Sequence, residues 1–309
     1  MPRSYTLRSL LMAAYATGAM VVHGQQDPLF SQYMFNTLAF NPAYAGSADV
    51  LTVLALSRHQ WVGFDGAPST QTFVAHSPLK NQNMALGFTA INDRAGPVRQ
   101  TGILADYAYR IRVSDDSQLA FGLKGGVNIF QADIASLSTV EVDPANVNIE
   151  GKLLPNFGFG LFYHSERYYV GLSAPKLLEN EISSGSTSAL ITASEVRHFF
   201  LMAGYVFDID RDVKFKPSFL LRRVEGAPLS LDINANFLLR EKIWLGAMYR
   251  LGNSFGLLAQ YQVSDQFRIG YAFDLTTTAL GAYNAGTHEI MLNYDLRFQR
   301  GKTVSPRYF

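Results

Sequence analysis

The sequence contains no cysteine. This absence excludes disulfide bonds, thiolate metal sites, cysteine nucleophiles and lipid attachment to a leading cysteine. Tryptophan is scarce, with 2 residues in a chain of 309, and the formal net charge is only +1. A chain so close to neutrality has no overall field that would attract nucleic acid, so we expect no nucleic-acid partner.

The sequence also lacks patterns for catalysis and for metal or cofactor binding. The histidines after the first two dozen residues are scattered, and none forms a pair at metal-ligand spacing. No G-x-S-x-G nucleophile elbow occurs, and the glycine-rich piece 122–126 does not introduce a helix. We therefore expect no cofactor, no metal and no enzymatic activity. The alternative is a surface protease or lipase that gathers distant residues, which a single sequence does not reveal.

Long apolar runs are missing beyond the N-terminus. The first two dozen residues carry a basic start, a short apolar stretch (10–22) and Gly24 ahead of two glutamines. This order is typical of a secretory signal peptide, so we expect residues 1–24 to be removed. An N-terminal anchor helix is the alternative, which the short and interrupted apolar stretch disfavours.

A repeated alternation of apolar with polar or glycine residues is present from about Val50 to Gln299. In the stretch 229–237, every second residue is apolar: Leu229, Leu231, Ile233, Ala235 and Phe237. A period of two over about 9–11 residues is typical of a transmembrane β-strand, whereas strands of soluble sandwiches are shorter. The pattern predicts an all-β fold, a transmembrane antiparallel β-barrel over residues 50–299.

The segments number about fourteen, and single-chain bacterial barrels have an even number of strands. We expect strands to start near Val50, Ser69, Gln82, Arg99, Ser117, Pro155, Arg167, Arg197, Val213, Leu229, Ile243, Ser254, Gln266 and Thr287. Connections after even-numbered strands are short and charged, whereas several after odd-numbered strands are long: 59–68, 132–154, 176–196 and 277–286. Because periplasmic turns are short and external loops long, both termini are expected in the periplasm.

The polar face of these strands is rich in glycine and in charged residues of both signs. The charged residues on this face are Lys124, Lys214, Lys216, Arg222, Asp232, Arg250, Arg268, Asp274, Glu289, Asp295 and Arg297. One interpretation is an anion-preferring pore or a site that receives a polypeptide. The other, which we favour, is a filled lumen in which opposite charges pair and glycines make room.

Several motifs occur in a fixed order. The stretches Gln26–Asn36 and Phe40–Ser47 precede the first strand, followed by Arg58–Trp61, Gly66–Gln71 and Pro155–Gly160. These motifs resemble the PorP/SprF family of outer-membrane proteins, which is associated with type IX secretion and gliding motility. The similarity covers essentially the whole mature chain, and the loop 176–196 is its least family-like part.

The resemblance implies a non-enzymatic barrel in the outer membrane of a Gram-negative bacterium. Such a component would support secretion or surface attachment of a cognate adhesin that carries a type IX C-terminal domain. The implied partners are outer-membrane lipid, other type IX components, and a periplasmic lipoprotein or peptidoglycan-linked protein. The alternative function is a porin-like channel for small solutes.

The N-terminal motifs form an aromatic cluster too dense to leave in water. We expect residues 25–49 to form a short periplasmic segment, which either plugs the barrel or docks a periplasmic partner. We prefer docking, because the segment ends in a turn that could direct it away from the barrel mouth. The candidate partner-binding residues are Asp27, Pro28, Phe30, Ser31, Gln32, Tyr33, Phe35, Asn36, Asn41, Pro42, Tyr44 and Gly46.

A second motif is expected in the first external loop. It consists of Arg58, Gln60, Trp61, Gly66 and Pro68. Proline and glycine would fix the turn, and the indole would anchor it. Residues 300–309, after the last strand, are expected to form a C-terminal tail.

Overall fold

The computed structural model describes residues 28–136, 148–183 and 192–296. The expected signal peptide (1–24), Asp27 and the expected C-terminal tail (300–309) lie outside the described residues.

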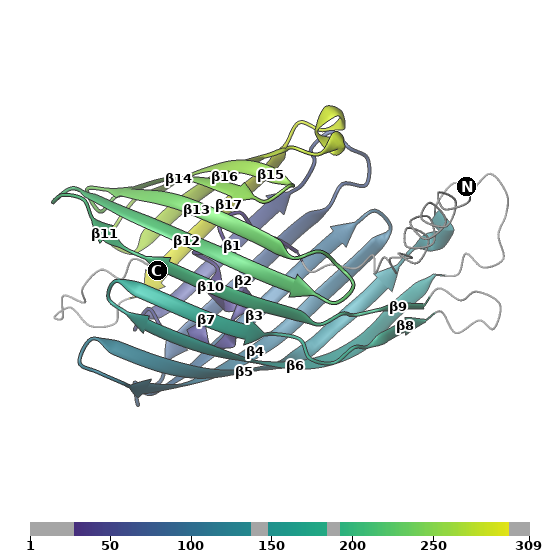
Figure 1. The fold of residues 1–309 in the computed structure, drawn as a ribbon. Coiled ribbons are helices and arrows are strands. Elements are labelled where there is room, and N and C mark those ends of the chain that lie inside the picture. The colour runs from purple at the N-terminus through teal and green to yellow at the C-terminus, as the bar shows by residue number, and fades with distance from the viewer. Residues whose placement is uncertain (1–27, 137–147, 184–191, 297–309) are drawn as a thin grey trace, which may run out of the picture.

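The described chain forms a closed antiparallel barrel of fourteen strands, as the alternation predicts (Figure 1). Each strand pairs with its neighbours in sequence, β1 closes on β17, and β10 pairs with both β7 and β12. A short piece, β11 (Phe207–Asp208), continues β10 after Val206 and pairs with β12. The wall strands are β1 (Leu51–His59), β2 (Ser69–Pro78), β3 (Met84–Ala95), β4 (Val98–Arg112), β5 (Ser117–Ala132), β6 (Ile149–Ser165), β7 (Tyr168–Ala174), β10 (His198–Tyr205), β12 (Val213–Val224), β13 (Ser230–Leu239), β14 (Ile243–Arg250), β15 (Ser254–Gln262), β16 (Phe267–Thr276) and β17 (Thr287–Leu296).

Side chains alternate between the two faces of the wall. On β13, Ile233 is 50% exposed on the outer face, whereas its neighbour Asn234 is 1% exposed and faces inward. The outer face is mostly apolar, as contact with lipid requires, and the inner face is mostly polar.

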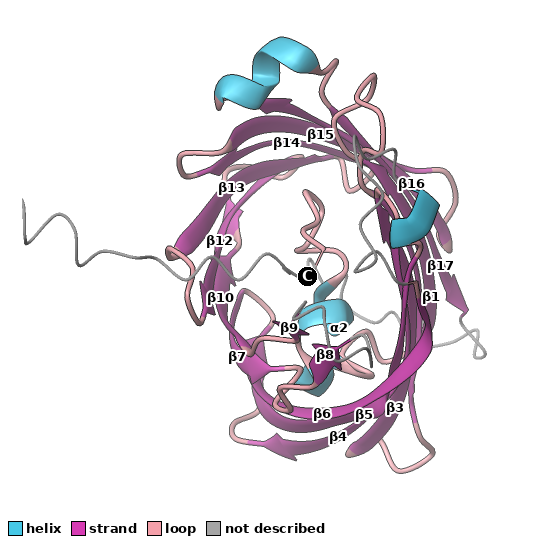
Figure 2. Cartoon of the chain, turned by 90° about the vertical axis from the view of Figure 1, so that its right-hand side faces the viewer, coloured by secondary structure: helices cyan, strands magenta, loops and turns pink. Residues whose placement is uncertain are grey.

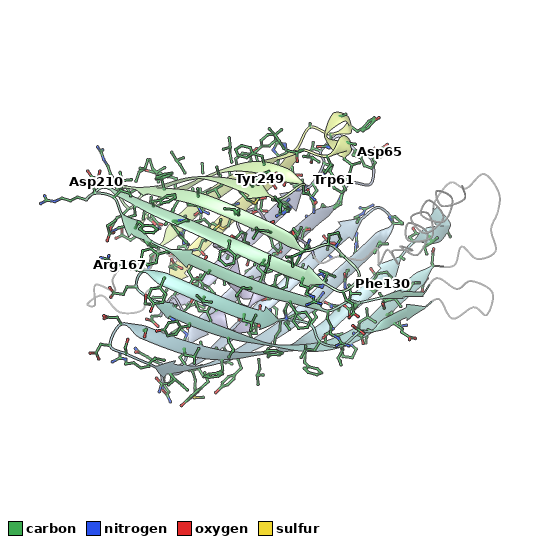
Figure 3. All side chains as sticks on the ribbon, in the orientation of Figure 1. Trp61, Asp65, Phe130, Arg167, Asp210 and Tyr249 are labelled. Atoms are coloured by element: carbon green, nitrogen blue, oxygen red, sulfur yellow. The ribbon has the colours of Figure 1, made fainter. Side chains whose placement is uncertain are left out.

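The two ends of the barrel differ in the length of their connections. At one end, here called the long-loop end, lie residues 60–68 and 277–286 and the described parts of two other connections, 133–136 with 148 and 175–183 with 192–197. The opposite short-turn end carries residues 113–116, 166–167, 209–212, 240–242 and 263–266. Figure 3 shows Trp61 and Asp65 at the first end and Arg167 and Asp210 at the second. This sorting agrees with the expected order of loops.

Small elements complete the described chain. The hairpin β8 (Glu181–Ser183) and β9 (Thr192–Ser194) lies within the connection from β7 to β10. The 3-10 helices η2 (Ile134–Ser136) and η3 (Ala279–Tyr283) belong to long-loop connections. Among the described residues, no helix has the length and apolar character needed to cross a membrane.

Residues 28–49, here called the internal segment, lie inside the barrel (Figure 2). They contain α2 (Thr37–Phe40) and η1 (Pro42–Tyr44). The larger of the two buried apolar clusters forms around this segment, with contributions from the inner faces of surrounding strands. The hydrophobic core of the protein is therefore inside the lumen.

The order of loops generates a labelling prediction. Because the sequence has no cysteine, each introduced cysteine is the sole thiol. A cysteine at Tyr283 or Glu150, both at the long-loop end, should react with an impermeant reagent on intact cells. A cysteine at Asp115 or Asp210, at the short-turn end, should react only after the outer membrane is opened. Equal labelling at both ends on intact cells contradicts this orientation.

The apolar outer face generates a stability prediction. Ile233→Arg places a charge near the middle of the lipid-facing stretch of β13 and should lower the free energy of unfolding by about 2–4 kcal/mol. The matched control is Leu229→Arg, at the residue that precedes β13 at the long-loop end, where the cost should be about 0–1 kcal/mol. Denaturant titration in lipid vesicles measures both values. A position-independent cost argues against a membrane-embedded face.

Candidate functional site

The internal segment passes along the lumen from the long-loop half of the barrel to the short-turn end. Pro28 shares a small cavity with Asn128 and Lys176, near the long-loop end. Gly46, at the other end of the segment, packs against Pro78 beside the turn between β2 and β3. The expectation that its final turn directs the segment away from the barrel mouth is therefore wrong.

Most of the candidate partner-binding residues are enclosed by the barrel wall. Their exposed fractions are 2% for Phe30, 2% for Ser31, 0% for Gln32, 1% for Tyr33, 2% for Asn36, 0% for Asn41 and 8% for Tyr44. Pro42 and Gly46 are also buried, and Pro28 and Phe35 are half-buried. Of the two alternatives for this segment, the described part has the position of a plug.

The first anchor of the internal segment is the carboxylate of Glu289, on β17. It accepts hydrogen bonds from the backbone amides of Ser31 and Gln32, both at 2.9 Å. Arg58, on β1, forms ion pairs with Glu289 at 2.9 Å and with Asp274 of β16 at 3.0 Å. The Ser31 hydroxyl accepts from Arg58 at 2.6 Å and donates to Asp274. Three buried charges from the wall are thus joined through one serine of the segment.

This arrangement corrects the expected position of Arg58. The sequence suggested an external-loop motif, but Arg58 lies in β1, is 3% exposed and points into the lumen. The remaining motif residues do occupy the connection from β1 to β2. Gln60 donates its amide to the carbonyl of Pro68 at 2.9 Å, and Gly66 has a φ of 71°. The amide of Trp61 donates to the Thr287 hydroxyl at 3.2 Å, which ties this loop to β17.

The second anchor is Asn41, which caps η1. Its carboxamide oxygen accepts from the amide of Ala43 at 3.0 Å, and its nitrogen donates to the carbonyl of Leu161 at 2.9 Å. A Cβ atom at Gly122 of β5 would overlap the backbone of Ala43, and one at Gly160 of β6 would overlap the Asn41 side chain. The glycines of the inner face therefore form the seat on which η1 rests.

The third anchor holds the end of the segment at the short-turn end. Arg110 of β4 donates to the carbonyl of Gly46 at 2.9 Å and pairs with Asp49 at 2.7 Å. The amide of Gly46 donates to Nδ1 of His76 at 3.1 Å. Gly46 has a φ of 71°, which favours glycine, and a Cβ there would also overlap the side chain of Ala85.

Aromatic rings fill the space between these anchors. Phe40 packs edge-on against Phe200 of β10, with ring centroids 5.2 Å apart, and Phe35 packs against Trp244 of β14 at 5.6 Å. The ammonium of the buried Lys216 lies 5.1 Å from the centre of the Phe35 ring. Burial raises the pKa of the Tyr33 hydroxyl well above its usual range, so Tyr33 stays neutral within the segment.

Several inward charges of the wall pair as the filled-lumen interpretation expects. Arg250 makes a bidentate contact with Asp232, with a shortest distance of 2.7 Å. Lys124 pairs with Asp106 at 3.1 Å and donates to the carbonyl of Leu38 at 3.1 Å.

A cluster around Glu195, ahead of β10, is not among the sites that the sequence pattern indicates. Its carboxylate accepts hydrogen bonds from the side chains of Gln100, Asn128, Asn156 and Asn180 at 2.6–3.3 Å. The cluster fastens the connection that carries β8 and β9 to the inner wall. The inward parity of the polar residues on β4, β5 and β6 was a signal for it, but the partner carboxylate was in a stretch with no alternation.

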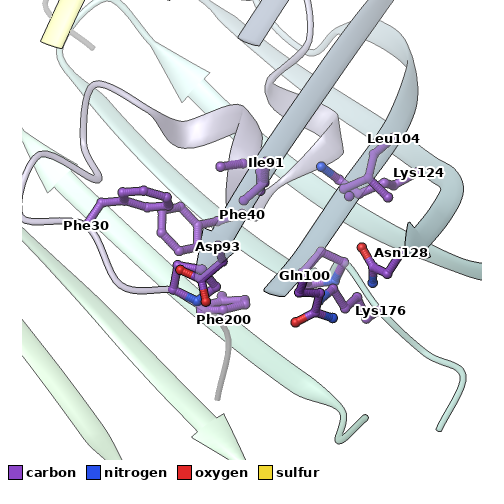
Figure 4. Close-up of a pocket in the computed structure, with 14 residues that line it drawn as sticks. Phe30, Phe40, Ile91, Asp93, Gln100, Leu104, Lys124, Asn128, Lys176 and Phe200 are labelled. Carbon is purple, nitrogen blue, oxygen red and sulfur yellow. The ribbon is translucent and has the colours of Figure 1, made fainter. Parts of the chain in front are cut away.

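A small cavity of about 50 Å³ lies between this cluster and the internal segment (Figure 4). Phe30, Phe40 and Phe200 line one side, and Gln100, Asn128 and Lys176 line the other. Its size admits only a few water molecules. Within the described ranges, no group of three or more His, Asp or Glu side chains could hold a metal ion.

Comparisons with solved structures agree with the barrel architecture. The monoaromatic hydrocarbon channel CymD has a TM-score of 0.50 at 10% identity, with 88% of this chain and 94% of that chain covered. A Pseudomonas aeruginosa FadL homologue gives 0.46 at 12% identity, covering 88% and 96%. Omp33 of Acinetobacter baumannii gives 0.44 at 12% identity, covering 81% and 100%. These likenesses concern the fold alone, and no curated protein matches the sequence.

A family model covers most of the chain. The model for the type IX secretion system membrane protein PorP/SprF matches residues 22–294, which include the internal segment and the whole barrel wall as far as β17. Outer-membrane location in a Gram-negative bacterium and association with secretion components follow from this membership. The chain therefore belongs to the PorP/SprF family of type IX secretion system membrane proteins.

Proposed function

We propose that this chain is a non-enzymatic component of the type IX machinery that supports secretion or surface attachment of a cognate adhesin. The observation that carries the proposal is the seating of the internal segment. The lumen holds the protein's own N-terminal motifs. The contacts are hydrogen bonds to the buried, ion-paired Glu289, the capped 3-10 helix η1, and the close approach of η1 to the glycine seat, Gly122 and Gly160. A barrel in which several buried charges, such as Arg58 with Glu289 and Arg250 with Asp232, pair with one another is suited to a structural role.

The cognate adhesin would carry a type IX C-terminal domain and would meet the barrel at its long-loop end. The connections there are stabilised by the Glu195 cluster and by the hydrogen bonds that tie Trp61 to Thr287. The described residues of this end line an open hollow of about 850 Å³ among residues 65–66, 94–99, 131–133 and 148–150.

A periplasmic lipoprotein or peptidoglycan-linked protein would meet the short-turn end. The turns there are short and charged, and ion pairs such as Arg167 with Asp208 at 3.0 Å hold neighbouring turns together. The internal segment reaches this end at Gly46 and Asp49. A periplasmic partner would therefore contact the N-terminal motifs near Gly46 and Asp49. The buried residues of the internal segment would hold these two residues in place.

The experiment that tests the proposal compares two functions in one strain. Deletion of the gene in its native host should remove the cognate adhesin from the cell surface, with growth on small solutes unchanged. The purified protein should be electrically silent in a planar bilayer. A steady large conductance together with normal adhesin display favours the porin-like channel instead.

The glycine seat generates a prediction about the plug. Gly122→Val drives two methyl groups into the backbone of η1 and should lower the free energy of unfolding by about 1–3 kcal/mol. It should also raise ion conductance, because the displaced segment no longer fills its part of the lumen. Thermal unfolding and planar-bilayer recordings measure the two effects.

The matched control is Gly125→Val on the same strand, where a Cβ atom meets nothing within 4 Å. It should leave both stability and conductance close to those of the unmodified protein. If Gly122→Val is as stable and as silent as this control, the internal segment is not seated as described.

A further inference from the structure

One part of the outer wall is less apolar than the rest. On β13, five successive outward residues are apolar, from Leu229 to Phe237. On β1, the outward residues are apolar only from Leu51 to Ala55, and Ser57 and His59 follow. The neighbouring strands β2, β3 and β4 change in the same way toward the long-loop end, so the change belongs to the wall and not to one strand.

The outward side chains of this wall form three successive cross-strand rows. The deepest row is apolar and consists of Leu292, Ala55, Phe73, Ala90 and Ile103. The next row consists of Ile290, Ser57, Gln71, Asn92 and Thr101, in which Asn92 donates to Thr101 at 2.8 Å. The outermost row carries His288, His59, Ser69, Arg94 and Arg99.

A recess of about 420 Å³ runs across the first two rows. The recess forms because Ala55, Ala90 and Ser57 are small, whereas the larger Phe73, Ile290 and Leu292 border it. Such a recess fits an acyl chain, which gains contact area in a groove of this kind compared with a flat apolar surface.

Arg94 and Arg99 face each other across the β3–β4 pair, both exposed. Like charges directly opposite on a sheet destabilise it unless an anion lies between them. No hydrogen bond or ion pair links either guanidinium to any of the residues that the structure describes. Asp65, Asp133 and Glu150 line the same hollow but are not paired with them.

The height of these arginines matches the edge of the bilayer. Ile103 is the last apolar outward residue of β4 before the polar rows, and Arg99 lies four residues beyond it, or about 13 Å along the strand. With the usual strand tilt this corresponds to about 10 Å along the membrane normal beyond the edge of the apolar band. The guanidinium groups therefore lie at the level of the headgroups at the long-loop face.

We propose that this wall is a binding site for a phosphorylated lipid of the leaflet at the long-loop face. The planar guanidinium groups of Arg94 and Arg99 bind the phosphate, for which their fork of donors is suited. The amide and hydroxyl groups of Gln71, Asn92 and Thr101 meet the polar region below the phosphate. An acyl chain occupies the recess over Ala55 and Ala90. The order of the three rows thus repeats the order of groups along one lipid molecule.

The test is a lipid titration of the purified full chain followed by native mass spectrometry, with lipid A as the probe and diacylglycerol as the lipid without phosphate. The unmodified protein should retain one lipid A and bind it at least about tenfold more tightly than diacylglycerol. The double variant Arg94→Gln, Arg99→Gln should lose this preference, with affinity for lipid A lowered by about tenfold or more.

Two further variants make the result specific. Arg223→Gln removes an exposed outward arginine of β12, on the opposite wall (Figure 2), and should bind lipid A normally. Ala90→Phe fills the recess and should weaken lipid A binding without touching the arginines. All of these positions face outward, and heat-modifiable migration on gels shows whether each variant has folded.

Four outcomes overturn the proposal. They are unchanged lipid A binding by the double arginine variant, an equal loss in Arg223→Gln, complete displacement of lipid A by millimolar inorganic phosphate, and a protein dimer in place of a lipid adduct. The third outcome indicates a free-phosphate site, and the fourth indicates that a second copy of the chain covers this wall.

Discussion

The arrangement of the whole lumen depends on how one buried carboxylate is compensated. Glu289 is fully enclosed, and an uncompensated charge there would cost several kcal/mol. Arg58 supplies a positive charge, but the same guanidinium also serves Asp274. The two amides of the internal segment therefore complete the coordination of Glu289. The wall needs the segment for its electrostatics as much as the segment needs the wall for the burial of its aromatic rings.

This mutual dependence separates the chain from a barrel that merely carries a plug. In the described part, polar contacts hold the internal segment at three heights, at Ser31, Asn41 and Gly46. The aromatic contacts lie between these heights and involve strands on different sides of the lumen, including β10 and β14. A change at one anchor therefore also disturbs the aromatic contacts on either side of it.

The wall could be predicted from the sequence because its rule is local. Each strand has a period of two, so the polarity of neighbours such as Leu231 and Asp232 indicates which side chain faces lipid and which faces the lumen. This assignment needs no information about the rest of the chain. The alternation along β1 places Arg58 on the same face as Leu54 and Leu56, which is the lumen face. The strand ends at His59, within the motif Arg58–Trp61, so only the last residues of the motif belong to the external loop.

The interior of the barrel could be predicted only in part, because its contacts join residues that are far apart in the sequence. The inward glycines indicated that something approaches the wall closely, but not that η1 does so at Gly122 and Gly160. The contact between Ser31 and Glu289 joins residues 258 positions apart, and a single sequence carries no record of that pairing. The choice between plug and docking segment rested on this missing information.

The separation of these contacts also fixes an order of assembly. The carboxylates that bind Ser31 and Gln32, those of Asp274 and Glu289, lie on the last two strands, β16 and β17. The strand β17 is also the one on which β1 closes the barrel. The first residues of the internal segment therefore cannot reach their final contacts until nearly all of the chain has been exported. Closure of the wall and anchoring of the interior become a single late event, so a truncated chain can complete neither.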